Sequence, residues 1–141
     1  MAGIYTYYSF KYYNYCGEMQ ATKIYISGPI TGVESAKLIF MNVDKFIRYN
    51  TNFITVSPFN NGLPDSASYE EHMKADLKML ERCDCIALMP GWQESEGCKR
   101  ELLRAIELGM RVFVIHRPSL KDGYILQGPV SYSWLIDVPE S

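Results

Sequence analysis

Two carboxylates occupy positions where a helix would turn them toward the interior of the protein. A helix beginning at Ser95 places Glu101 on the apolar stripe of the segment 95–108, whereas the neighbouring charged side chains point away from that stripe. An ionised carboxylate is costly to bury unless a partner compensates it. Glu101 is therefore either a border residue paired with a nearby arginine or a carboxylate that faces a ligand.

The second carboxylate, Asp76, adjoins the apolar stripe of Met73, Leu77 and Leu80 on the preceding predicted helix. Taken alone, Asp76 is equally well interpreted as a boundary residue of a solvated helix. Two inward carboxylates on consecutive helices that flank one strand are instead typical of acid/base or nucleophilic chemistry. We therefore predict that Glu101 and Asp76 are the catalytic residues.

A glycine-containing turn after the first predicted strand is the candidate ligand-binding loop. Its glycines allow close approach to the backbone, and its N–H groups and hydroxyls suit a phosphate or a ribose, although the turn matches neither a Walker loop nor G-x-G-x-x-G. A serine at a helix start could hold a phosphate as well as cap the helix, and two aromatic residues could stack on a base or cover the sheet. These candidates are Ser27, Gly28, Pro29, Ile30, Thr31, Gly32, Phe59, Trp92 and Ser95.

Strands and helices alternate through most of the chain. Periodicity predicts strands at 23–27, 53–56, 85–89 and 111–116 and helices at 34–49, 69–82 and 95–108. This alternation predicts an α/β fold, a Rossmann-like (flavodoxin-like) parallel sheet of at least four strands with helices on both faces. Ligands bind such sheets beyond the carboxyl ends of the strands, so the loops around 28–33, 58–68 and 90–95 should meet there.

The two ends of the chain differ from the predicted α/β domain, which spans residues 23–118. Residues 1–22 form a Tyr-rich N-terminal extension with six of the 11 tyrosines, and such a segment suits an edge strand, an oligomer contact or a mobile extension. Residues 119–141 contain Trp134-Leu135-Ile136. We expect this C-terminal segment to form a last strand or a tail that packs on the domain.

Charge and composition exclude several classes of partner and binding site. A net charge of −2 over 141 residues provides no basic patch for a nucleic-acid polymer, and no apolar run approaches the roughly 20 residues that span a bilayer. The N-terminus has no signal-peptide pattern, so we expect a cytoplasmic protein, in the host cytoplasm if a phage encodes it. The spacing of Cys83 and Cys85 is too short for a zinc site, and free thiols are expected rather than disulfides. We expect no metal and no cofactor.

These motifs together resemble the DUF4406 family of phages and bacteria. The resemblance rests on KIYISGPITG at 23–32, on Asp76 with Cys83-Asp84 following, and on PGW at 90–92 through Glu101-Leu102-x-x-Ala105. It covers about residues 23–116. The family is similar to the nucleoside 2-deoxyribosyltransferases and the deoxynucleoside 5′-monophosphate N-glycosidases.

The resemblance implies a role for each carboxylate. Glu101 would attack the anomeric carbon of the sugar, Asp76 would help the base leave as general acid, and water or a second base would split the covalent glycosyl-enzyme. Ser95 and Gly97 would hold a 5′-phosphate, and the 27–32 loop would line the sugar and base pocket. Glu96 departs from this pattern because its negative charge beside the phosphate site would repel an anion.

We therefore predict an N-glycoside hydrolase or glycosyltransferase that acts on a nucleoside, a nucleotide or a nucleotide-derived signal. The alternative is a non-catalytic protein of the same fold that binds or sequesters a nucleotide, such as a phage protein that traps a nucleotide immune messenger. An oligomeric scaffold built on the tyrosines would leave the two inward carboxylates without a role. The resemblance further implies a homo-oligomer with a shared active site.

Overall fold

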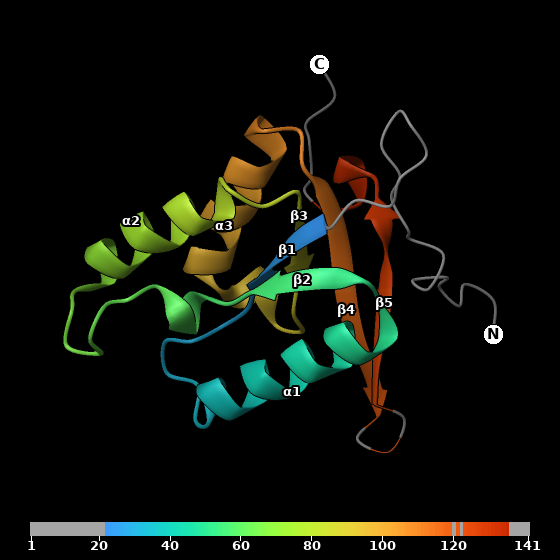
Figure 1. Cartoon of the computed structure of the whole chain (residues 1–141), viewed down its shortest axis with the longest axis horizontal. Helices are drawn as coiled ribbons and strands as arrows, with labels where there is room; N and C mark the ends of the chain where they lie inside the picture. The colour runs from blue at the N-terminus through green and yellow to red at the C-terminus, as the bar shows by residue number, and fades with distance from the viewer. Residues whose placement is uncertain (1–21, 120, 122, 136–141) are drawn as a thin grey trace.

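The computed structural model describes residues 22–119, 121 and 123–135, and these form one five-stranded sheet. The sheet has the order β2-β1-β3-β4-β5, in which the first four strands are parallel and β5 is antiparallel to β4 (Figure 1). The predicted α/β fold with at least four parallel strands is therefore confirmed. The strands are β1 (Thr22–Ser27), β2 (Phe53–Val56), β3 (Cys85–Leu88), β4 (Arg111–Ser119) and β5 (Gly123–Val130).

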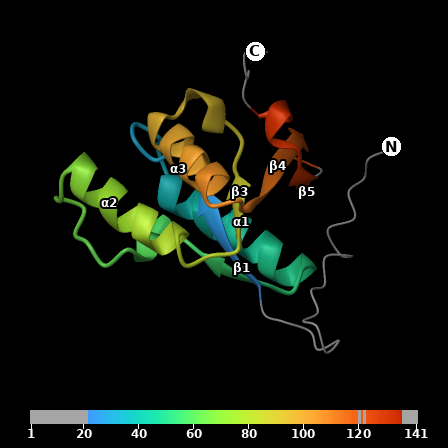
Figure 2. The ribbon, with the colours of Figure 1, turned by 90° about the horizontal axis from the view of Figure 1, so that it is seen from above.

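Helices cover both faces of the sheet, as predicted. Figure 1 shows α1 (Ala36–Asn50) below the sheet, with α2 (Tyr69–Leu80) and α3 (Glu96–Glu107) above it. Seen from above in Figure 2, α2 and α3 lie side by side. Three short 3-10 helices complete the described elements: η2 (Pro58–Asn60), η3 (Trp92–Glu94) and η4 (Tyr132–Trp134).

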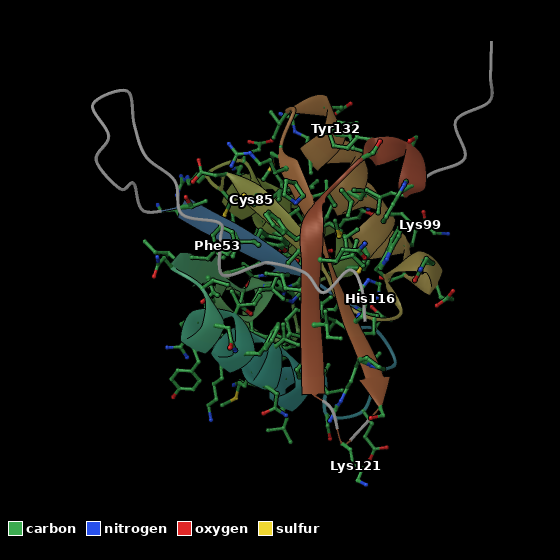
Figure 3. All side chains as sticks on the ribbon, turned by 90° about the vertical axis from the view of Figure 1, so that its right-hand side faces the viewer. Phe53, Cys85, Lys99, His116, Lys121 and Tyr132 are labelled. Carbon is green, nitrogen blue, oxygen red and sulfur yellow. The ribbon has the colours of Figure 1, made fainter. Side chains whose placement is uncertain are left out.

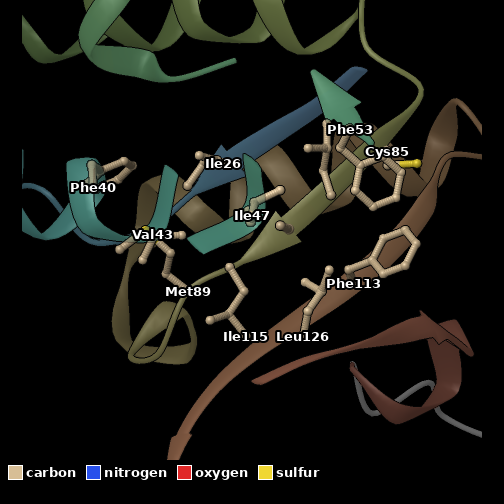
Figure 4. Close-up of a cluster of buried hydrophobic side chains, with 12 residues drawn as sticks. Ile26, Phe40, Val43, Ile47, Phe53, Cys85, Met89, Phe113, Ile115 and Leu126 are labelled. Atoms are coloured by element: carbon tan, nitrogen blue, oxygen red, sulfur yellow. The ribbon is translucent and has the colours of Figure 1, made fainter. Parts of the chain in front are cut away.

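Alternate residues of β1 enter the two halves of the core. Ile24 and Ile26 belong to the cluster between the sheet and α1, where Phe40, Val43 and Ile47 pack against the sheet (Figure 4). Tyr25 points to the opposite face and joins a second cluster with residues of β3 and α3. Because successive side chains of a strand point to opposite faces, Tyr25 and Ser27 of this short strand share the face that α3 covers.

The C-terminal part of the sheet differs from the prediction. β4 continues through Pro118, beyond the predicted end at residue 116. Past Val114 it no longer pairs with β3. A proline on an unpaired strand edge, here within an irregular stretch of the β4–β5 register, removes no ladder hydrogen bond. Figure 3 looks onto this hairpin, with Lys121 at its turn.

The fifth strand lies at 123–130, within the C-terminal segment that we expected to form a last strand or a packing tail. Trp134 belongs to η4 and is 68% exposed, whereas Leu126 of β5 is buried in the core. Ile136 and the tyrosines of residues 1–15 lie outside the described residues. In the described part of the chain, Cys83, Cys85 and Cys98 are free thiols, and no helix has the length and apolar character needed to cross a membrane.

Candidate active site

A cavity of about 1100 Å³ lies beyond the carboxyl ends of the first three strands. Its wall is built from the loops that follow β1, β2 and β3 and from the facing sides of α2 and α3. This is the place where parallel α/β sheets bind ligands, because loops from neighbouring strands meet there. Both predicted catalytic residues, Glu101 and Asp76, line it.

Glu101 is held in the wall by two hydroxyl groups of β1. Its side chain is buried, with 5% of the residue exposed. The Tyr25 hydroxyl donates to Oε2 at 2.6 Å, and the Ser27 hydroxyl donates to Oε1 at 2.7 Å. α3 begins where predicted, because the Ser95 Oγ accepts a hydrogen bond from the backbone N–H of Cys98. The sheet and the helix together therefore fix both oxygens of one carboxylate.

Burial controls the protonation of Glu101. Removal from water raises the pKa of Glu101 to about 7, the hydrogen bonds from Tyr25 and Ser27 oppose this increase, and the negative charge of Asp76 adds to it. Burial also raises the pKa of Tyr25 well above 10, so its hydroxyl remains a donor at neutral pH. Glu101 thus changes charge close to neutrality.

Asp76 lies on α2 in the wall of the same cavity and is also buried, with 6% of the residue exposed. α2 begins at a capping box, in which Ser68 and Glu71 exchange side-chain and backbone hydrogen bonds. Asn61 Nδ2 donates to Asp76 Oδ1 at 2.8 Å. Burial raises the pKa of Asp76, while this hydrogen bond and the nearby His72 lower it. Two carboxyl groups with raised pKa values in one cavity are typical of acid/base chemistry.

Comparisons with known proteins place this chain in a family. Residues 22–114 match the family described as a domain of unknown function, DUF4406. The chain belongs to the DUF4406 family. Among solved structures, the DUF4406 chain is similar to a "2-desoxiribosyltransferase from Leishmania mexicana", with a TM-score of 0.51 and 20% identity over 83% of this chain and 87% of that one. At this identity the likeness establishes a common fold. No curated protein sequence matches.

Most residues predicted to bind the ligand line the DUF4406 cavity. They come from all three loops and from the start of α3: Gly28, Pro29, Ile30, Thr31, Phe59, Ser95 and Gly97. Ser27 is fully buried and acts on the site through Glu101. Gly28 is required for packing, since a Cβ there would collide with the side chain of Met89.

Two predicted ligand-binding residues lie elsewhere. Trp92 is only 7% exposed and packs in the hydrophobic cluster with Leu88 of β3 and Leu102 of α3. Gly32 is not part of the cavity wall and occupies a turn with φ of +74°. Of the two aromatic residues expected to stack on a base, only Phe59 lines the cavity, where its ring also meets Phe40 edge-on.

Several residues of the DUF4406 site were missed from the sequence. Tyr25 lies two positions before Ser27 in a strand, so the period of two could have placed it on the same face. His72 lies four positions before Asp76 and could have been placed next to it on a helix. Asn61 lies in an irregular loop, where no periodicity indicates the direction of a side chain.

The charged side chains on the cavity wall are mainly carboxylates. Among the described residues that line the cavity there is no lysine or arginine. The nearby Arg100 is engaged outside, where it forms a salt bridge with Glu70. In the described residues, no three His, Cys, Asp or Glu side chains are grouped as a metal site. The acidic residues on the wall are Asp65, Asp76, Glu94, Glu96 and Glu101.

Proposed function

We propose that this protein cleaves or transfers the N-glycosidic bond of a nucleoside, with Glu101 as the nucleophile and Asp76 as the general acid. The observation that carries the proposal is the presence of two buried carboxyl groups in one cavity, each held by hydrogen-bond donors. The fold shared with a solved 2-desoxiribosyltransferase supports glycosyl transfer as the reaction type.

The first step needs one ionised and one protonated carboxyl group. Ionised Glu101 attacks C1′ of the sugar as the bond from C1′ to the base nitrogen breaks, and Asp76 transfers its proton to the departing base. The products are a neutral base, a glycosyl ester of Glu101 and an ionised Asp76. Hydrogen bonds from Tyr25 and Ser27 hold the attacking carboxylate in one orientation, which lowers the entropic part of the barrier.

The second step reverses these roles. Asp76 accepts a proton from water, or from the N–H of a second base, as the oxygen or nitrogen attacks C1′. The ester bond breaks and Glu101 regains its negative charge. Water gives hydrolysis and a second base gives transfer, so the same residues support both reactions.

The charge of the wall favours an uncharged nucleoside over a nucleoside monophosphate. Ser95 and Gly97 line the cavity, but the carboxylates of Glu94 and Glu96 flank them. A phosphate there would meet like charges with no lysine or arginine among the described lining residues. Uncharged nucleosides, or nucleosides with a cationic base, meet no such repulsion.

The test is a screen of nucleosides, deoxynucleoside monophosphates and ADP-ribose derivatives. Released base is measured by chromatography, and intact bound ligand by native mass spectrometry. We expect base release from an uncharged nucleoside by the wild-type protein and none by Glu101→Gln, with Glu107→Gln on the exposed side of the same helix as the control. Intact ligand that stays bound without base release would instead identify a nucleotide-binding protein.

A further inference from the structure

A short hydrogen-bonded chain leads away from Asp76. The amide nitrogen of Asn61 donates to Asp76 Oδ1 at 2.8 Å and also lies 3.0 Å from Nδ1 of His72. The other ring nitrogen of His72, Nε2, lies 3.1 Å from the backbone carbonyl oxygen of Pro64. Asn61 and His72 both line the cavity, and neither is used in the two steps above.

The partners of this chain determine the orientation of each group. A carbonyl oxygen only accepts, so Nε2 of His72 must carry a hydrogen toward Pro64, and in the neutral ring Nδ1 is then an acceptor. Asn61 must therefore present its NH₂ group to His72. The amide oxygen of Asn61 accepts from the backbone N–H of Leu63 at 2.9 Å, which requires the same orientation. The flipped amide would break the bonds of Asn61 to His72, Asp76 and Leu63.

We propose that His72, acting through Asn61, positions Asp76 for proton transfer by leaving only its Oδ2 to carry the proton. Both amide hydrogens of Asn61 are used, one toward Nδ1 of His72 and one toward Oδ1 of Asp76. Oδ1 is thereby fixed as an acceptor. His72 and Asn61 are positioning residues, and their role rests on the proposed function of Asp76 as the general acid.

Without the ring of His72, one amide hydrogen of Asn61 loses its acceptor. The bonds to Leu63 and Asp76 then hold the amide without the third, and the loop that follows η2 loses its tie to α2 through Pro64. Proton transfer from Asp76 should therefore become slower. The attack of Glu101 should keep its rate, because residues of β1 hold Glu101.

The test compares two substrates that differ in their need for an acid. A purine nucleoside requires a proton on its departing base, whereas its N7-methylated counterpart carries a cationic base that leaves neutral without one. The variants are His72→Ala, Asn61→Ala and His72→Asn, whose side-chain oxygen lies close to the place of Nδ1. Lys74→Ala, on the exposed side of α2, is the control.

We expect His72→Ala and Asn61→Ala to lower kcat on the purine nucleoside by about 10- to 100-fold, which is less than the loss of the acid itself would cost because Asp76 remains in place. Turnover of the methylated nucleoside should change by less than about threefold, and His72→Asn should restore most of the loss. An equal loss on both substrates, or no loss on either, would overturn the inference.

A second measurement is independent of turnover. ¹³C NMR titration of the Asp76 carboxyl should show a higher pKa in Asn61→Ala and His72→Ala than in the wild type, because a donor to the ionised form is lost or misplaced. An unchanged titration in both variants would overturn the inference. If the wild type cleaves neither nucleoside, the proposed function is wrong, and the titration alone decides whether His72 and Asn61 position Asp76.

Discussion

At the residue scale, competing effects determine whether Glu101 is ionised. Burial disfavours its charge, whereas the hydroxyls of Tyr25 and Ser27 favour it. The negative charge of Asp76 opposes ionisation further, so the two carboxyl groups titrate as a pair and hold one proton between their two apparent pKa values. The upper of these values lies near 7, the pKa of Glu101. The form that the first step needs, with Glu101 ionised and Asp76 protonated, is one of the two arrangements of this single proton.

This shared proton predicts a bell-shaped pH dependence. The reaction needs one ionised and one protonated carboxyl group, so kcat/KM should fall as pH rises above about 7 and the last proton is lost. In Tyr25→Phe a donor to ionised Glu101 is missing, the pKa of Glu101 rises, and the alkaline limb should move to higher pH. Steady-state rates between pH 4 and 9 test this, with the exposed Tyr49→Phe as the control. Superimposable alkaline limbs would contradict the prediction.

The same carboxyl group predicts a pH-dependent stability. Since the pKa of Glu101 is raised from 4.5 to about 7 in the folded protein, the folded state binds more protons than the unfolded state between these values. The free energy of unfolding should therefore fall, by about 3 kcal/mol, as pH rises from below 4.5 to above 7. Glu101→Gln lacks this contribution.

Urea denaturation of the wild type, Glu101→Gln and the control Glu107→Gln measures this effect. We expect Glu101→Gln to gain stability relative to the wild type as pH rises from 4.5 to 8, whereas Glu107→Gln should keep a constant difference. A constant difference for Glu101→Gln would mean that burial does not raise the pKa of this group.

Residue positions could be predicted from the sequence where a period applies. The helical period placed Glu101 and Asp76 on inward faces, and both are buried in the cavity wall. Trp92 begins the three-residue helix η3 and Asn61 lies in a loop, and in such short or irregular segments tertiary packing decides which way a side chain points. Tyr25 and Glu101 are 76 positions apart in the sequence. Their contact depends on how α3 packs over β1, which local sequence does not specify.

At the scale of elements, the strand-helix alternation predicted the parallel strands of the sheet, but it did not predict β5. Gly128-Pro129 interrupts the strand pattern of β5 and argues against a strand when the sequence is considered alone. β5 pairs only with β4, so one of its edges tolerates a missing N–H. Antiparallel pairing across a short turn thus added a strand that no βαβ unit predicted.

The first turn of α3 predicts how the site treats a phosphate. Glu96 is exposed in this turn and lines the cavity between Ser95 and Gly97. Glu96→Gln removes one repulsive charge and leaves the positive end of the helix dipole. We expect a nucleoside monophosphate to bind about three- to tenfold more tightly to this variant, with less effect at high salt, and a nucleoside to bind unchanged. Calorimetric titration of both ligands tests this, and equal gains for both would exclude an electrostatic cause.

At the scale of the whole molecule, the cavity is assembled from parts that are distant in the sequence. Loops after three strands and the sides of two helices meet only when the sheet is complete. Ile30 lines the cavity and is 38% exposed, and α1 exposes the apolar side chains of Leu38 and Met41. These exposed apolar groups suit a contact with a second copy of the chain.

We therefore predict a homo-oligomer with closed, two-fold symmetry, the commonest form of such assemblies. Light scattering should give more than the monomer mass for the full chain. Two variants locate the contact: a chain that begins at Met19 lacks the tyrosine-rich extension, and Leu38→Lys with Met41→Lys alters α1. Aromatic side chains are enriched at interfaces, so the extension is one candidate for the contact. Loss of the oligomer only on truncation would place the contact there. Loss only in the α1 variant places it beside the cavity, where it should also lower activity. A monomeric full chain would contradict the prediction.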